Sequence, residues 1–321
     1  MALYEDMKVF SGNAHRKLAK DICAYMDIPL GKCEVFKFSN DNTFVKILEN
    51  IRQQDVFLVQ PIAYPVNDHI MELLIMIDAA KRASAGRITA VVPYFAYARS
   101  DKKDQPRVPI TARLVANLIE TAGADRVLTL ELHAGQIQGF FNIPLDELSA
   151  IPELAQHFKE RQVENNIVVV ATDAGDAKRA RNMAYRLYAP LAIVEKVRMG
   201  NQERVESATL IGDVRDRTAI IVDDEIGTGG TVIATANTLR NHGARDIYCY
   251  AAHPVLAGNA TEVLERSDIR QLVVTDSLPI PHIKMGTKTS VISVAPMLGE
   301  AIQRIHSGSS VGAMFNGGGA T

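Results

Sequence analysis

The 321-residue sequence contains no tryptophan and only three cysteines. Cys23, Cys33 and Cys249 lack the paired spacing of disulfide frameworks and structural zinc sites, so we interpret them as reduced packing residues. No apolar stretch is long enough to span a membrane, and the start MALYEDMKVF lacks a basic region followed by an apolar one. The net charge of −2 offers no global basic surface to nucleic acid. These absences predict a soluble cytoplasmic protein without a membrane or nucleic-acid partner.

A Walker A loop is also absent, because no G-x-x-x-x-G-K-[ST] occurs in the chain. The most informative segment is instead TAIIVDDEIGTGGT, residues 218–231. It reads as a buried strand over Ala219–Val222, two carboxylates at Asp223 and Asp224, a glycine-rich loop, and a helix over Thr231–His242. The loop consists of Ile226 followed by Gly227, Thr228, Gly229, Gly230 and Thr231.

This order of residue types indicates a site for an anion beside a polyol or a metal. Glycines let the backbone approach an anion closely, and N–H groups at a helix start point toward it. Two carboxylates repel a phosphate, so they must serve sugar hydroxyls or a divalent cation beside it. The predicted ligand is a phosphorylated sugar. A plain strand-to-helix turn with surface acids is the alternative, and the acidic pair at the strand end makes it less favoured.

Short apolar strands alternate with helical stretches throughout, which predicts an α/β fold with two mostly parallel sheets flanked by helices. The segment ITARLVANLIETAGADRVLTLELH resembles TVIATANTLRNHGARDIYCYAAH. Both predict a helix that ends at a glycine, followed by a charged pair, a strand and a histidine. We therefore expect two similar domains, residues 1–147 and 148–294. The glycine-rich end, residues 316–321, is predicted to be disordered. The expected strands include Lys8–Phe10, Val35–Phe38, Val56–Val59, Ile88–Pro93, Arg126–Leu130, Ile167–Ala171, Leu191–Val194, Ile247–Ala252 and Leu272–Thr275.

The segment VDDEIGTGGT resembles the phosphoribosyl-binding loop of type I phosphoribosyltransferases, in the version found in ribose-phosphate pyrophosphokinases. Other segments match that family from about Met7 to Phe315. The resemblance implies two phosphoribosyltransferase-like domains and a C-terminal helix, residues 295–315, that packs on the N-terminal domain. It implies a kinase of nucleotide biosynthesis that uses Mg²⁺ to transfer the diphosphoryl group of ATP to the C1 hydroxyl of ribose 5-phosphate. It also implies a homo-oligomer, a hexamer, whose ATP site is shared between subunits.

The resemblance assigns roles to five segments. In the first domain, ATP is held by the segments FSNDN and YFAYARSDKK, through Phe38, Asn40, Asp41, Asn42, Arg99 and Ser100. The metal is held by His133 of LHAGQIQGFF and by Asp173. In the second domain, ribose 5-phosphate is held by Asp223, Asp224 and Gly227 to Thr231, and the diphosphate loop is TDAGDAKRA, with Asp173, Gly175, Asp176 and Arg179. Lys196 and Arg198 are the implied catalytic cations.

By their residue types alone, several of these segments have ordinary structural readings. A turn rich in Asn and Asp, a basic loop, and a lone histidine after a strand are all common without a ligand. The chain also departs from the family pattern at Asn40, Asp41, Asn42 and Ser100. Asp176 stands where a second glycine is usual, and it either repels a diphosphate or serves as a helix N-cap.

Three alternatives to the diphosphokinase stay open. A phosphoribosyltransferase that consumes phosphoribosyl diphosphate shares the glycine-rich loop but needs only one such domain. A non-catalytic or weakly active partner subunit is favoured by Asp41, Asn42, Ser100 and Asp176, while Lys196, Arg198 and His133 argue against it. A two-domain α/β protein with an unrelated ligand is the third alternative.

Overall fold

The computed structural model describes residues 4, 6–161, 166–198 and 205–315, which form two compact units. Unit 1 contains Met1–Leu148, Ser277–Pro279 and Ser293–Thr321, and unit 2 contains Ser149–Asp276 and Ile280–Ile292. The tail predicted to be disordered, residues 316–321, lies outside the described residues. Among the described helices, none has the length and apolar character needed to cross a membrane.

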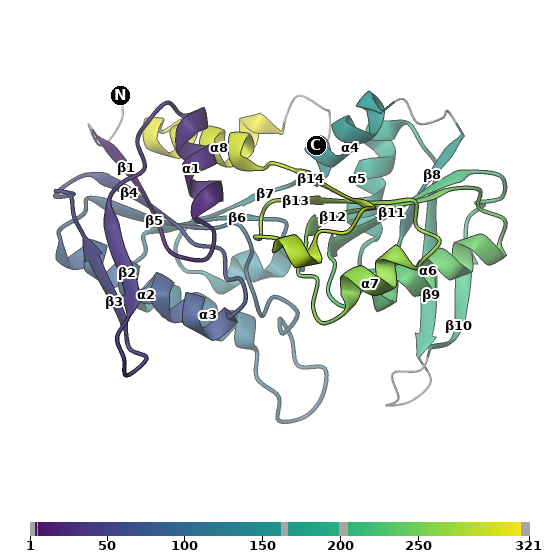
Figure 1. Cartoon of the computed structure of the whole chain (residues 1–321), viewed down its shortest axis with the longest axis horizontal. Coiled ribbons are helices and arrows are strands. Elements are labelled where there is room, and N and C mark those ends of the chain that lie inside the picture. Colours follow the sequence, from purple (N-terminus) through teal and green to yellow (C-terminus); the bar gives the residue numbers. More distant parts are fainter. Residues whose placement is uncertain (1–3, 5, 162–165, 199–204, 316–321) are drawn as a thin grey trace. The chain divides into compact units, whose positions relative to one another are not determined.

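Unit 1 is built on a five-stranded parallel sheet with the order β1-β4-β5-β6-β7. The strands are β1 (Met7–Ser11), β4 (Asp55–Val59), β5 (Arg87–Val92), β6 (Arg126–Leu130) and β7 (Leu145–Leu148). Helices α2 (Val66–Arg82) and α3 (Thr111–Ala122) lie on one side of the sheet, and α1 (Arg16–Tyr25) and α8 (Ala295–Ser307) lie on the other (Figure 1). The central strands are buried on both faces, which explains their continuous apolar runs.

Helix α8 returns from the end of the chain to pack against α1 in unit 1. Gly299 meets the Tyr25 ring so closely that a Cβ there would lie 2.6 Å from the ring carbon Cδ1. Arg87 donates a hydrogen bond of 2.9 Å to the carbonyl of Ile305 and pairs with the buried carboxylate of Asp55. His306 lies 3.0 Å from the same carboxylate. These polar contacts fix the last helix on the sheet of unit 1.

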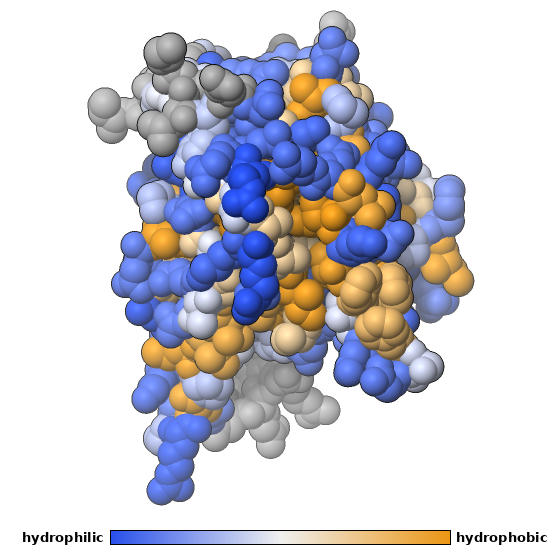
Figure 2. All heavy atoms as spheres, turned by 90° about the vertical axis from the view of Figure 1, so that its left-hand side faces the viewer, coloured by the Kyte–Doolittle hydropathy of each residue, from blue (hydrophilic) through white to orange (hydrophobic). Residues whose placement is uncertain are grey.

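One of the expected strands of the first domain lies outside the parallel sheet of unit 1. The strand predicted at Val35–Phe38 is β2 (Cys33–Lys37), which pairs antiparallel with β3 (Thr43–Ile47) in a separate two-stranded hairpin. The predicted strand is confirmed, whereas its pairing in a separate hairpin was not predicted. Its residues alternate largely between half-buried and exposed, as expected for a strand with one solvated face, whereas the central parallel strand β4 is buried throughout. Figure 2 views the chain from the side of unit 1, where apolar patches are interspersed with polar ones; exposed apolar residues of this unit include Tyr25, Phe36, Phe38, Leu48 and Tyr64.

Unit 2 is built on a seven-stranded sheet with the order β10-β9-β8-β11-β12-β13-β14, parallel except for the antiparallel pair β9 and β10. The strands are β8 (Ile167–Ala171), β9 (Leu191–Arg198), β10 (Val205–Ile211), β11 (Thr218–Glu225), β12 (Ile247–His253), β13 (Gln271–Thr275) and β14 (Thr289–Ile292). Helices α4 (Ile151–Glu160) and α5 (Ala177–Leu187) cover one face, and α6 (Gly230–Asn241) and α7 (Ala260–Glu265) cover the other (Figure 1). A short 3₁₀ turn, η2 (His282–Lys284), lies in unit 2, and two others, η1 (Gly135–Phe140) and η3 (Gly312–Met314), lie in unit 1.

The two segments that resemble each other in sequence form the same structure in the two units. In unit 1, α3 ends at Gly123, whose φ is +116°, and β6 follows next to β5. In unit 2, α6 ends just before Gly243, whose φ is +85°, and β12 follows next to β11. Glycine is the residue that adopts these left-handed angles at little cost, so the predicted helix stops are confirmed.

Candidate active site

The glycine-rich loop joins the carboxyl end of β11 to the start of α6. Strand β11 runs three residues further than predicted, through Glu225, so both carboxylates of the acidic pair belong to the strand. The loop is held at its base by two backbone hydrogen bonds, from Ile226 N–H to the carbonyl of His253 (2.8 Å) and from Ala257 N–H to the carbonyl of Gly227 (3.0 Å). This anchoring places the loop at the sheet edge where ligands bind in α/β folds.

The loop backbone is built as an anion cradle. Gly229 is the N-cap residue of α6. Its φ of +81° is a left-handed conformation that residues with a side chain rarely adopt. The N–H groups of Thr228 and Gly229 have no hydrogen-bond partner among the described residues, and the first N–H groups of any helix lack partners within it. A Cβ added to Gly227 would meet nothing within 4 Å, so this side of the loop is open. The cradle thus presents several N–H donors to solvent.

Beside the cradle lie the two buried carboxylates of Asp223 and Asp224. Their exposed fractions are only 7% and 2%. The Asp223 carboxylate accepts a hydrogen bond of 2.9 Å from the Asp224 N–H, and the Asp224 carboxylate accepts one of the same length from the Glu225 N–H. Burial, together with the neighbouring charge of Asp176, holds the pKa of Asp223 well above its usual range. A buried acidic pair of this kind favours a bound cation or hydroxyl donors.

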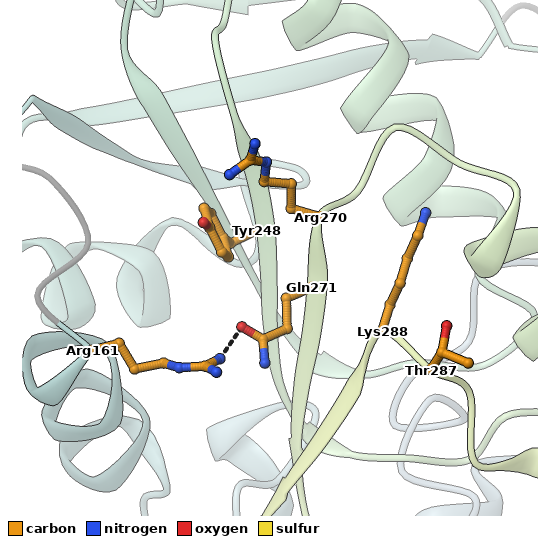
Figure 3. Close-up of a pocket in the computed structure, with 6 residues that line it drawn as sticks. All are labelled: Arg161, Tyr248, Arg270, Gln271, Thr287 and Lys288. Atoms are coloured by element: carbon orange, nitrogen blue, oxygen red, sulfur yellow. Dashed lines mark hydrogen bonds between the residues drawn. The ribbon is translucent and has the colours of Figure 1, made fainter.

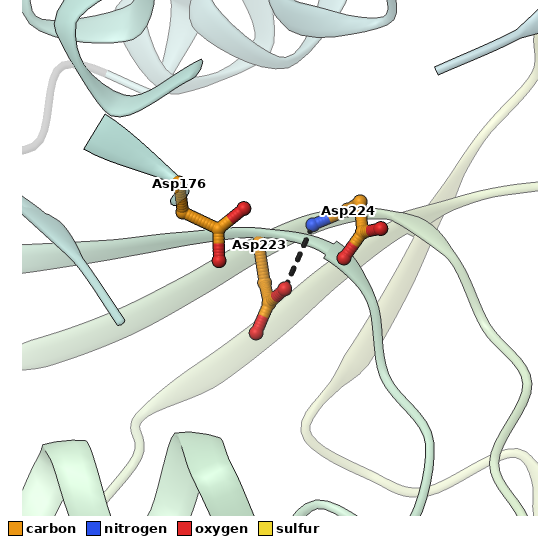
Figure 4. Close-up of side chains that lie close together, drawn as sticks. All are labelled: Asp176, Asp223 and Asp224. Atoms are coloured by element: carbon orange, nitrogen blue, oxygen red, sulfur yellow. Dashed lines mark hydrogen bonds between the residues drawn. The ribbon is translucent and has the colours of Figure 1, made fainter. Parts of the chain in front are cut away.

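Asp176 joins this acidic pair from the loop between β8 and α5. Oxygen atoms of Asp176, Asp223 and Asp224 lie within 4.8 Å of one another, and Figure 4 shows the Asp176 and Asp223 side chains side by side. The Asp176 carboxylate accepts a hydrogen bond of 2.9 Å from the Thr172 hydroxyl and forms an ion pair with Arg179. Burial raises the pKa of Asp176, while the charge of Arg179 opposes that rise. The sequence did not predict that Asp176 completes an acidic cluster.

The predicted diphosphate loop therefore has a polar network of its own. Asp176 occupies the N-cap position of α5, but its side chain makes no capping hydrogen bond, because it is turned to Thr172 and Arg179. Asp173 is exposed, and its carboxylate accepts a hydrogen bond of 3.0 Å from the Asp176 N–H. Gly175 lies between them and is exposed. The helix start that was predicted to cradle an anion thus carries an internal carboxylate.

In unit 1, the segment FSNDN forms the tip of the β2–β3 hairpin. The Phe38 N–H donates to the carbonyl of Asn42 (2.9 Å), which closes the turn. Asp41 has a φ of +68°, so it adopts the left-handed conformation that glycine favours. Phe38 is half exposed and packs edge-on against Phe36 and Phe44. Asn40, Asp41 and Asn42 are exposed.

The other residues predicted to bind ATP follow β5, and the predicted metal ligand His133 follows β6; these strands are parallel neighbours, so their carboxyl ends meet at one sheet edge. Arg99 and His133 are both exposed there. The Ser100 hydroxyl accepts a hydrogen bond of 3.1 Å from the Thr111 N–H and lies 3.2 Å from the Thr111 hydroxyl. Ser100 therefore joins its loop to the start of α3.

Lys196 and Arg198 lie at the end of β9, which continues four residues beyond the predicted strand. They pair with Ala208 and Val205 of β10. Residues 199–204 lie outside the described residues, and β10 begins directly after them at Val205.

The chain has two mostly parallel sheets flanked by helices, and the sheet of unit 2 carries an anion cradle and buried carboxylates at its carboxyl edge. These features place it among the α/β proteins that bind phosphorylated ligands at the carboxyl ends of strands. Family models described as the N-terminal domain of ribose phosphate pyrophosphokinase and as a phosphoribosyl synthetase-associated domain match residues 7–123 and 197–316. The ribose-phosphate pyrophosphokinase of Bacillus caldolyticus is 50% identical over 97% of this chain and 98% of its own, and that of Agrobacterium fabrum is 50% identical over 97% and 100%. A crystal structure of phosphoribosylpyrophosphate synthetase from Mycobacterium smegmatis matches with a TM-score of 0.89 at 40% identity, over 94% of this chain and 99% of that one. The chain belongs to the ribose-phosphate pyrophosphokinase family, and the predicted fold class is confirmed.

Proposed function

We propose that this enzyme transfers the diphosphoryl group of ATP to the C1 hydroxyl of ribose 5-phosphate, producing AMP and phosphoribosyl diphosphate. Its family membership supports the reaction class. The observation that carries the proposal is the juxtaposition of an N–H cradle at the start of α6 with the buried carboxylates of Asp223 and Asp224. No phosphate-binding loop of the Walker A type competes with it in the sequence.

Each part of the cradle has a role in this proposal. The N–H groups from Gly227 to Thr231 bind the 5-phosphate, with the hydroxyls of Thr228 and Thr231 as additional donors. Asp223 and Asp224 accept hydrogen bonds from the ring hydroxyls and so orient the C1 hydroxyl. The reaction then depends mainly on positioning and on neutralising negative charge, since diphosphoryl transfer needs little covalent chemistry from a protein.

The residues present fit Mg²⁺. Three carboxylates with oxygens within 4.8 Å of one another form a hard-oxygen donor set, and burial makes their unneutralised charge costly. Asp223 and Asp224 would hold the ion beside the sugar, and Asp176, which is paired with Arg179, lies next to them; His133 and Asp173 remain our predicted ligands for the ion that accompanies ATP. Bound Mg²⁺ supplies neutralisation of phosphate oxygens. Lys196 and Arg198 add positive charge to the diphosphoryl group during transfer.

ATP binds to unit 1 in this proposal. Phe38 offers a half-exposed ring for a base, Asn40, Asp41 and Asn42 offer polar groups at the hairpin tip, and Arg99 pairs with phosphate oxygens. Ser100 supports the loop that carries Arg99. We further propose that the domains 1–147 and 148–294 are the ATP and sugar domains, that the enzyme is a cytoplasmic homo-oligomer, and that neighbouring subunits complete the ATP site.

A second candidate, a weakly active or non-catalytic partner subunit, is favoured by the ion pair of Asp176 with Arg179, because it occupies the predicted diphosphate loop with a negative group. Incubation of the pure protein with ATP, Mg²⁺ and ribose 5-phosphate separates the two. AMP formation that requires ribose 5-phosphate supports the diphosphokinase. Bound ribose 5-phosphate without AMP formation supports the partner subunit.

A further inference from the structure

Unit 2 contains a pocket of about 330 Å³ that is separate from the candidate active site. Figure 3 shows the side chains around it: Arg161 reaches in from the end of α4, and the others come from the starts of β12, β13 and β14. The lining residues are Arg161, Tyr248, Arg270, Gln271, Thr287 and Lys288. Its volume is within the range of sites that bind small molecules, roughly 300–1,000 Å³.

The pocket lies at the amino ends of the parallel strands, whereas Asp223 and Asp224 lie at their carboxyl ends. Asp223 of β11 pairs with Ala251 of β12, which lies three residues beyond Tyr248 in the same strand. Tyr248 pairs in turn with Gln271 of β13, and β13 is two strands away from β11. With about 3.3 Å per residue and about 4.8 Å per strand, the pocket is displaced by about 10 Å along the strands and about 10 Å across them. A ligand there does not overlap the acidic cluster.

The cationic side chains of the pocket are held in place by neutral groups. The Gln271 carbonyl oxygen accepts a hydrogen bond from Arg161, and its amide nitrogen donates to the Ser290 hydroxyl at 2.6 Å. Gln271 therefore uses both ends of its amide to orient the Arg161 guanidinium over the strand starts. The Lys288 ammonium donates to the carbonyl of Ser267 at 2.8 Å. Both cations are thus positioned before any ligand arrives, which reduces the entropy lost on binding.

The charge of the pocket favours an anion. Three cations and no carboxylate line it. Arg270 pairs with Asp246 at 3.0 Å and also bonds the Tyr248 hydroxyl, so its charge is partly compensated. Glu265 accepts hydrogen bonds from the Thr287 hydroxyl and the Lys288 N–H. Within the part of the chain that the structure describes, neither Arg161 nor the Lys288 ammonium forms an ion pair with a carboxylate.

We propose that this pocket binds the phosphate group of a small phosphorylated molecule. Arg161 supplies up to four further N–H donors in a planar fork that matches phosphate oxygens, and the charges of Arg270 and Lys288 add to the positive potential of the pocket. The half-buried ring of Tyr248, which packs edge-on against Phe158, forms a wall for the non-phosphate part of the molecule. The same chemistry suits free phosphate and a phosphate monoester.

Equilibrium dialysis of the full-length chain tests the proposal, with ³²P-labelled phosphate in one arm and labelled AMP in the other. Ribose 5-phosphate is left out of both arms, because it is itself a phosphate monoester and would compete for the pocket, and binding at the cradle cancels in the comparison between variants. The wild type is compared with the double variant Arg161→Gln/Lys288→Met. A matched variant, Lys20→Met/Arg266→Gln, removes two exposed cations that lie outside the pocket.

We expect the pocket variant to lose one binding site per chain, or to bind at that site at least tenfold more weakly, while the matched variant binds like the wild type. A loss only in the phosphate arm identifies free phosphate as the ligand, and a loss only in the AMP arm identifies a monoester. Equal binding by wild type and pocket variant in both arms overturns the proposal. If the double variant does not fold, Arg161→Gln alone gives the same comparison. Because ribose 5-phosphate turnover is not the readout, the result is independent of the proposed function.

Discussion

The carboxylate of Asp176 forms an ion pair with the guanidinium of Arg179, which follows it by three residues at the start of α5. Both side chains are largely buried, with exposed fractions of 15% and 11%. In the proposed reaction, Arg179 belongs to the loop that receives the diphosphate. In that reaction an internal carboxylate thus competes with the substrate for the same cation.

Replacing Asp176 by glycine is therefore expected to raise the affinity for a non-hydrolysable ATP analogue, or the turnover, by about tenfold, equivalent to about 1.4 kcal/mol. The change releases Arg179 and removes one negative charge near the diphosphate. Asp176→Asn is the matched control, since it removes the charge but keeps the size of the side chain. Calorimetric titration measures the affinity; a value that is unchanged or lower in both variants means that the carboxylate is well accommodated.

Lys196→Ala is expected to slow turnover by about 10²–10³-fold and to change the affinity for ribose 5-phosphate by less than about twofold. The reason is that a cation at the end of β9 acts on the transferring group rather than on the sugar phosphate. Steady-state kinetics with AMP detection gives the first quantity, and direct binding gives the second. Lys20→Ala is the surface control. A large loss of sugar-phosphate affinity with retained turnover would contradict the proposed role of Lys196.

Two glycines of the cradle are expected to respond differently to alanine. Gly229→Ala places a side chain at a φ of +81° and within 3.3 Å of Leu264, so it should lower the free energy of unfolding by about 1–2 kcal/mol. Gly227→Ala adds a methyl group to an open side of the loop, so stability should be kept while ribose 5-phosphate binds less tightly. Urea unfolding and ligand titration of both variants test this. Equal stability losses in the two variants would contradict the described loop geometry.

Asp223→Asn is expected to stabilise the metal-free protein by about 1 kcal/mol and to weaken ribose 5-phosphate binding at least tenfold. Burial and the charge of Asp176 raise the pKa of Asp223, so its ionised form opposes folding at neutral pH. Asparagine keeps the acceptor for the Asp224 N–H without the charge. Denaturant unfolding with a chelator present measures the stability. A destabilised variant would show that the ionised carboxylate supports the fold.

The thiol of Cys23 is expected to react slowly. Burial raises its pKa from 9.0 to about 11, so at pH 8 about 0.1% is thiolate, compared with about 9% for an unperturbed thiol. Burial raises the pKa of Cys249 as well. Ellman's reagent at pH 8 should therefore label both thiols much more slowly in the native protein than in denaturant. The same raised pKa predicts that Cys23 contributes stability below pH 9 that is lost as the pH rises toward 11.

Local sequence patterns predicted the strand, the loop and the helix around Asp223, as well as the helix stops at Gly123 and Gly243. These features depend on neighbouring residues, since an apolar run, a left-handed glycine and a helix start are set within one turn. The hairpin of β2 and β3 was missed because an isolated apolar run does not show which sheet it joins. Asp176 was missed as a partner of Asp223 because 47 residues separate them, and only the pairing of β8 with β11 brings them together.

The position of ribose 5-phosphate in a crystal structure of the full chain, soaked with the sugar phosphate and Mg²⁺, is the most direct test of the account. We predict the 5-phosphate against the N–H groups of residues 227–231, with the ring hydroxyls at Asp223 and Asp224. A well-occupied sugar phosphate elsewhere, with this loop empty, would contradict it.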